Sequence, residues 1–224
     1  MRSTKIRLIF LLLLIMPLVS IFAMDSMHRI SANPPAAAFN EKVEVNKPFG
    51  LCHAGYSASD KEYDLLNDLG NNWLRVDFSW ASIEREVGVW NYSYYDNYVQ
   101  KANERGQKIL AILDYGHPKL GHDSIFYISP DQIPYYLEYV NRTVSRYRTN
   151  VTAFEIWNEP NHVGFWRGTQ EEFFELFNQA AELIYDIDPN IKIAGPAMAG
   201  HDPRYIAQMF QLGVTRRLHA ISFH

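Results

Sequence analysis

The sequence predicts an α/β protein in which parallel strands alternate with helices around a barrel. Short apolar runs alternate with longer amphipathic segments from residue 49 onward, as in parallel strands joined by covering helices. Polar residues follow several of the apolar runs, which is typical of a barrel whose chemistry lies on the loops after its strands. We therefore expect an incomplete (β/α)8 TIM barrel with about six strands and five helices.

Six apolar runs predict the strands, at residues 49–55, 73–79, 108–115, 153–157, 191–197 and 220–224. Helical patterns lie between them, at about residues 60–70, 94–106, 130–148, 170–187 and 203–213. Thr169 and Glu172 form a capping pattern at the start of one helix. Gly70, Gly106 and Gly213 follow three helix ends. Strand and helix therefore alternate in a regular order.

An open, doubly wound sheet is the alternative architecture. It would carry a glycine-rich first turn for a nucleotide, but Gly50 and Gly55 in "GLCHAGYS" lack the required spacing. The barrel is therefore favoured. A complete ring has about eight strand units, so we expect two units to be missing from this chain.

The first 23 residues are predicted to be a signal peptide or a membrane anchor. Basic residues precede an apolar run from Leu8 to Phe22, which is short for a bilayer span of ~20 residues. Ile21 is not the small residue that cleavage prefers, so an uncleaved anchor stays open. Residues 24–48 read as a leader rich in Pro and Ala, and 49–224 as the folded domain. We expect a secreted or extracytoplasmic protein that contacts a membrane only through its amino-terminal segment.

Composition excludes several classes of partner. A net charge of -4 gives no basic excess for nucleic acid, and the single cysteine, Cys52, allows no intrachain disulfide. His117, His122 and Asp123 cluster in "HPKLGHD", but their spacing matches no common metal-ligand set. No metal or organic cofactor is implied. The oligomeric state stays open.

The stretch "EIWNEPN" places a carboxylate at the tip of an apolar strand. In isolation Glu159 could be an ordinary helix-entry residue. The motif resembles the signature after the fourth strand of the clan A glycoside hydrolases, barrels that cleave glycosidic bonds with retention of configuration. The likeness extends over residues 49–224: "LRVDFSWASIEREVGVWNYSYYDNYVQKANERGQKILAILDY" resembles the second and third strand units, particularly of families 39 and 5, and "ISFH" resembles the sixth strand.

The resemblance implies an O-glycosyl hydrolase acting on β-glycosidic bonds of an oligo- or polysaccharide. Glu159 would be the acid/base, and Asn158 would contact the hydroxyl next to the reacting carbon. The family arginine at Arg75 contacts the nucleophile, although a structural ion pair with Asp77 is an alternative. His224 matches a position that lines the cleft near the nucleophile.

Four further residues are expected to contact substrate. Tyr115 and His117 follow the third strand, where a merely packing loop is the alternative. Trp80 and Trp157 are expected to present ring faces to sugars. Glu155 lies four positions before Glu159 on the same strand, so we expect it to face the core deeper in the barrel and to be paired.

In this family the nucleophile is a second glutamate after the seventh strand, so we expect this chain alone to be inactive. A non-catalytic carbohydrate-binding barrel is the second hypothesis. A third is a barrel enzyme for a phosphorylated metabolite, against which stand the export signal and the lack of a glycine-rich phosphate loop. The sequence leaves the sugar and its linkage undecided.

Overall fold

The computed structural model describes residues 50–52, 59–120 and 124–224. The predicted signal peptide and leader lie outside these residues, as do His53, His122 and Asp123. Within the described ranges, no helix combines the length and the apolar character needed to cross a membrane.

The strands form one parallel sheet in which each strand pairs with the next one along the chain. The predicted α/β fold, an incomplete TIM barrel, is therefore confirmed. The sheet order follows the sequence: β1 (Gly50–Cys52), β2 (Trp73–Asp77), β3 (Lys108–Leu113), β4 (Ala153–Ile156), β5 (Lys192–Met198) and β6 (Ala220–Phe223).

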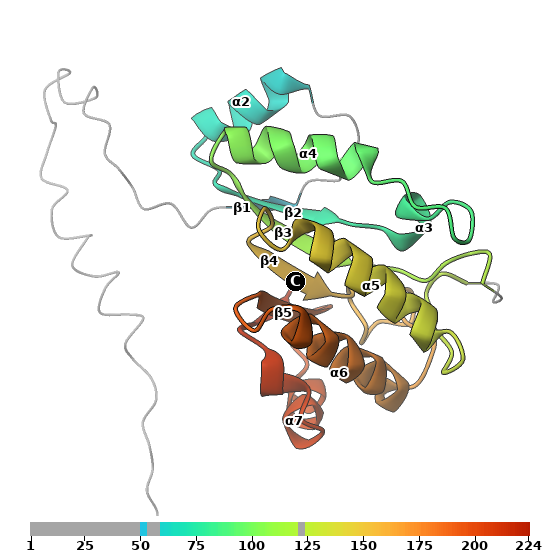
Figure 1. The fold of residues 1–224 in the computed structure, drawn as a ribbon. Helices are drawn as coiled ribbons and strands as arrows, with labels where there is room; N and C mark the ends of the chain where they lie inside the picture. The colour runs from blue at the N-terminus through green and yellow to red at the C-terminus, as the bar shows by residue number, and fades with distance from the viewer. Residues whose placement is uncertain (1–49, 53–58, 121–123) are drawn as a thin grey trace, which may run out of the picture. The chain divides into compact units, whose positions relative to one another are not determined.

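Helices connect these strands and follow one another along the outside of the sheet (Figure 1). They are α2 (Asp60–Asp68), α3 (Trp80–Ile83), α4 (Ser93–Glu104), α5 (Ile133–Tyr147), α6 (Gln170–Ile187), α7 (Pro203–Gln211) and the 3-10 turn η2 (Val214–Arg217). Among the helices of the described residues, the prediction omitted the two shortest, α3 and η2. A helical turn of four residues is too short to show a periodic apolar pattern.

Helix α6 shows how local sequence and packing agree. The Thr169 side chain accepts a hydrogen bond from the Glu172 amide at 3.2 Å, and Glu172 accepts one from the Thr169 amide at 2.7 Å, which confirms the predicted capping pattern. One face of the helix then buries Phe173, Phe174 and Phe177. These rings extend the core that supports the end of β4, since Phe173 contacts Trp157 with ring centroids 6.4 Å apart.

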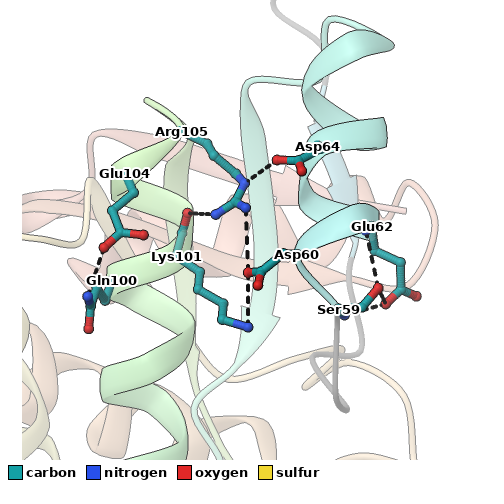
Figure 2. Close-up of polar contacts among 8 residues, drawn as sticks. All are labelled: Ser59, Asp60, Glu62, Asp64, Gln100, Lys101, Glu104 and Arg105. Carbon is teal, nitrogen blue, oxygen red and sulfur yellow. Dashed lines mark hydrogen bonds and ion pairs between the residues drawn. The ribbon is translucent and has the colours of Figure 1, made fainter.

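Charged contacts fasten α2 to α4 (Figure 2). Arg105, at the end of α4, donates a hydrogen bond to Asp64 at 2.6 Å, and Lys101 forms an ion pair with Asp60 at 3.1 Å. The Arg105 guanidinium also lies over the ring of Tyr63, the buried residue of α2. Because exposed ion pairs contribute little to stability, Tyr63 is the principal anchor of this helix.

Candidate active site

The chain turns sharply where β4 ends. Trp157 and Glu159 both adopt left-handed backbone conformations, with φ of 66° and 49°, and they flank Asn158. Such conformations cost about 1–3 kcal/mol for residues other than glycine, so the surroundings must hold them. The Glu159 amide donates to the Ala197 carbonyl at 2.7 Å, and Asn158 forms a bridge with the same residue of β5. The neighbouring strand therefore fixes the backbone of the Asn-Glu pair.

The Glu159 carboxyl meets His224 at the end of β6. The two side chains are hydrogen-bonded through Oε1 and Nδ1 at 2.7 Å, and they are 20% and 40% exposed. The His224 amide donates to the Met198 carbonyl at 2.9 Å, which holds the histidine against β5. Two predicted site residues, 65 positions apart, therefore lie together at the carboxyl ends of their strands and remain accessible to solvent.

Arg75 joins two side chains of the neighbouring motif. Its Nε donates to Glu155 at 2.6 Å and its Nη2 donates to the Asn158 oxygen at 2.8 Å. The Asn158 amide nitrogen in turn donates to the Tyr115 hydroxyl at 3.1 Å. Glu155 is completely buried, which confirms that it faces the core and is paired. The chain of hydrogen bonds sets the orientation of Asn158 beside Glu159.

Of the two predictions for Arg75, the structural ion pair forms, but its hydrogen-bonded partner is Glu155 rather than Asp77. Asp77 experiences Arg75 only as a nearby charge. Desolvation raises the pKa of Asp77, although solvent still reaches part of the residue, and the charge of Arg75 opposes that rise. The charge of Arg75 therefore compensates mainly the completely buried Glu155, and to a smaller extent that of Asp77.

Asp114, just after β3, is a buried titratable group that the sequence analysis missed. Both of its carboxyl oxygens are shielded from water. Burial, followed by the charge of Asp77, raises the pKa of Asp114 well above its ordinary value, which favours the protonated form. The available signal was a carboxylate directly after an apolar strand in "AILDY".

Three expectations about substrate contacts need correction. Trp80 and Trp157 are 1% and 0% exposed, so neither presents a ring face to a ligand. Their indole nitrogens donate inside the protein, to Glu84 at 2.6 Å and to the Phe165 carbonyl at 2.8 Å. His117 is also buried, and its two ring nitrogens contact the Glu84 carbonyl and the Lys119 amide. All three side chains therefore belong to the buried interior of the protein.

A parallel barrel with an Asn-Glu pair at the end of its fourth strand is the arrangement of the clan A glycoside hydrolases, and this chain has both features. The model of "Glycosyl hydrolases family 39" matches residues 133–224. A beta-xylosidase of Caldicellulosiruptor saccharolyticus is 30% identical over 180 residues, or 68% of this chain and 37% of that protein. A beta-xylosidase of Geobacillus stearothermophilus is 26% identical over 162 residues, or 62% of this chain and 32% of the relative.

Solved structures agree in fold. A family 39 glycoside hydrolase from Bacteroides cellulosilyticus WH2 superposes with a TM-score of 0.67 at 19% identity, covering 78% of this chain and 37% of that one. A GH39 beta-xylosidase from Caulobacter crescentus gives a TM-score of 0.60 at 23% identity, covering 75% and 43%. The chain belongs to glycoside hydrolase family 39. It spans about a third of the length of the curated relatives it matches.

The buried ion pair predicts a test of stability. Arg75→Met should lower the free energy of unfolding by about 3–5 kcal/mol, because it leaves Glu155 charged and unpaired in the core. The double variant Arg75→Met, Glu155→Met should recover most of that loss, since no charge then stays buried. Denaturant unfolding measures both. As a control, Arg142→Met removes the exposed pair with Glu138 and a guanidinium contact with the Trp90 ring, and should cost at most about 1.5 kcal/mol. A loss as small for Arg75→Met would contradict the expected role.

Asp114 predicts a dependence of stability on pH. Because its folded pKa is raised, the native state holds a proton that the unfolded state has lost above about pH 4, so stability falls as pH rises towards the folded pKa. Asp114→Asn removes that proton equilibrium and should flatten the decline between about pH 5 and pH 8, as measured by urea unfolding. The exposed Asp68→Asn should follow the parent. Parallel curves for Asp114→Asn and the parent would show that the carboxyl titrates normally.

Proposed function

We propose that this chain is part of the catalytic domain of a retaining glycosidase in which Glu159 is the acid/base. The observation that carries the proposal is the setting of its carboxyl, which is partly exposed at the end of β4 and hydrogen-bonded to His224 of β6. A proton donor must be reachable by the substrate and yet held in one place. A surface glutamate at a helix entry would not need two left-handed residues and a backbone bond to β5 to orient it.

Glu159 would protonate the glycosidic oxygen as the bond to the leaving group breaks, and then remove a proton from the water that releases the glycosyl intermediate. Asn158 would contact the hydroxyl beside the reacting carbon. Its oxygen is occupied by Arg75, so its amide nitrogen, which also faces Tyr115, is the group left to donate. His224, which contacts the Glu159 carboxyl, would orient that carboxyl towards the leaving oxygen.

Retention requires a second carboxylate about 5–5.5 Å from the first, on the other side of the sugar. Glu155 is unsuited to that role because it is completely buried and bound to Arg75. We assign the nucleophile to a glutamate outside this chain, and we expect the chain alone to bind sugar without turnover.

The names of the curated relatives guide the choice of substrate. Both are beta-xylosidases, and we therefore propose β-linked xylo-oligosaccharides as the first substrates to test. We also propose that the protein is exported through residues 1–23 and meets its saccharide outside the cytoplasm.

A single substitution tests the role of Glu159. In a protein that carries this chain together with the downstream coding sequence, Glu159→Gln should lower kcat/KM for xylobiose by about 10²–10⁴-fold, because the leaving sugar needs a proton. The loss in kcat/KM should be much smaller for aryl xylosides with acidic leaving groups, which depart without a proton. With these aryl xylosides, azide should take the place of the water that attacks the glycosyl intermediate, and should thus partly restore turnover and yield a glycosyl azide of retained configuration.

Glu138→Gln, an exposed carboxyl on α5, is the matched control and should retain parental rates. Equal losses on good and poor leaving groups would exclude Glu159 as the proton donor. A parent that binds xylobiose but releases no reducing sugar would instead support a non-catalytic carbohydrate-binding barrel.

A further inference from the structure

Three carboxyl side chains lie on the same face of the sheet as Arg75. In a parallel sheet, residues paired across strands point to one face, and so do residues two positions apart on one strand. The register pairs Ile112 with Asp77 on β2 and with Glu155 on β4. Asp114 follows Ile112 by two positions, and Arg75 precedes Asp77 by two. The strands therefore gather three acidic groups and one guanidinium near their carboxyl ends.

Asp77 and Asp114 lie within hydrogen-bonding reach of each other. Asp114 is 0% exposed, and within the described part of the chain neither of its carboxyl oxygens has a hydrogen-bond donor. Buried polar groups are nearly always paired, but two carboxylates cannot pair because both only accept. A proton on one of the two carboxyls supplies the missing donor. Because Asp77 is exposed, its charge is the less costly one, and the proton belongs on Asp114.

Four tyrosines lie near enough to Asp114 to interact with its charge: Tyr95 on α4, Tyr115 after β3, and Tyr136 and Tyr139 on α5. The hydroxyls of Tyr136 and Tyr139 donate to backbone carbonyls near the ends of β3 and β2. Those of Tyr95 and Tyr115 accept from a backbone amide and from Asn158. Burial raises the pKa of all four, so they stay neutral. The proton on the acidic pair therefore has no substitute among these hydroxyls.

Arg75 has to serve these carboxyls as well as the site. It donates to Glu155 and to Asn158. If Asp77 and Asp114 were both ionised, three carboxylates would face this one guanidinium. We propose that Asp114 keeps a proton, through which it donates a hydrogen bond to Asp77, so that the pair carries one negative charge. Arg75 then stays bonded to Glu155 and Asn158. Asp114 is thus a positioning residue that acts through Arg75, a role that rests on the proposed function and extends it.

Loss of this proton should weaken catalysis at alkaline pH. The pair would become doubly charged and would draw Arg75 away from Asn158, which contacts the substrate in the proposed mechanism. Two substitutions separate the proton from the carboxyl that holds it. Asp114→Asn keeps a donor in the same place, and this donor does not dissociate as pH rises. Asp114→Leu has a similar branched shape but no donor.

The test uses a protein that carries this chain with its downstream coding sequence and the substitution Glu159→Gln. This background removes the titration of Glu159, and dinitrophenyl β-xyloside departs without a proton, so the pH profile of kcat/KM reports other groups. Adding Asp114→Leu should lower kcat/KM about tenfold at neutral pH, the usual effect of one lost hydrogen bond. Adding Asp114→Asn should recover most of that loss and move the alkaline fall to higher pH. Asp68→Asn, exposed on α2, should leave the profile unchanged.

A background profile without an alkaline fall overturns the positioning role, and so does an equal fall after Asp114→Asn is added. Melting temperatures show which variants are folded at each pH. If Asp114→Leu is unfolded, the shift of the alkaline fall in Asp114→Asn decides the matter.

The proton is also detected without turnover. A protonated carboxyl has an infrared carbonyl band that carboxylates lack. Spectra of the same background at neutral pH should contain such a band, which Asp114→Asn removes and Asp68→Asn keeps. A spectrum that Asp114→Asn leaves unchanged overturns the shared proton.

A protein with its native Glu159 that cleaves no xyloside would count against the proposed function alone, while the infrared band still tests the proton. Positioning is then tested by calorimetric titration of the Glu159→Gln protein with xylobiose. Affinity that falls at alkaline pH, but not after Asp114→Asn is added, supports the role of Asp114. The same pH dependence in both proteins, or no binding, overturns it.

Discussion

Glu155 is a carboxylate without exposed surface, and the arrangement around Glu159 depends on how its charge is compensated. Arg75 supplies the compensation at 2.6 Å, and the same guanidinium reaches Asn158 at 2.8 Å. Because a planar guanidinium donates in fixed directions, an arginine that pairs with Glu155 can orient Asn158 as well. The ion pair thus does more than offset a desolvation cost. It links β2 to β4, and because Arg75 is held by the buried Glu155, it holds Asn158 in a defined orientation at the site.

The second constraint comes from β5. Trp157 and Glu159 adopt left-handed conformations that an isolated chain would rarely populate. Burial of the Trp157 ring and the bond from the Glu159 amide to Ala197 offset this strain. β5 also holds His224 through Met198, so one strand places both partners of the Glu159 and His224 contact. An accessible carboxyl can therefore keep a defined direction.

The tryptophans show that a prediction of sugar contacts from residue type alone can be wrong. An aromatic ring next to a catalytic motif fits sugar binding and core packing equally well, and only burial separates the two. Trp80 stacks on Tyr139, and Trp157 packs among the rings of Tyr115, Tyr136 and Trp166. The aromatic content of this chain near the site therefore builds a rigid support, while the groups left for a ligand are hydroxyls, amides and carboxyls.

The sequence alone determined the alternation of strands and helices, the parallel barrel, the capping of α6 and the place of Glu159 at a strand end, because periodicity, caps and short motifs are local properties. Only the tertiary structure decided the partner of Arg75, the burial of Trp80, Trp157 and His117, and the meeting of Glu159 with His224. The raised pKa of the buried Asp114 belongs to the same group. These depend on distances between segments far apart in the chain and on access to solvent, and neither is encoded in any short stretch of sequence.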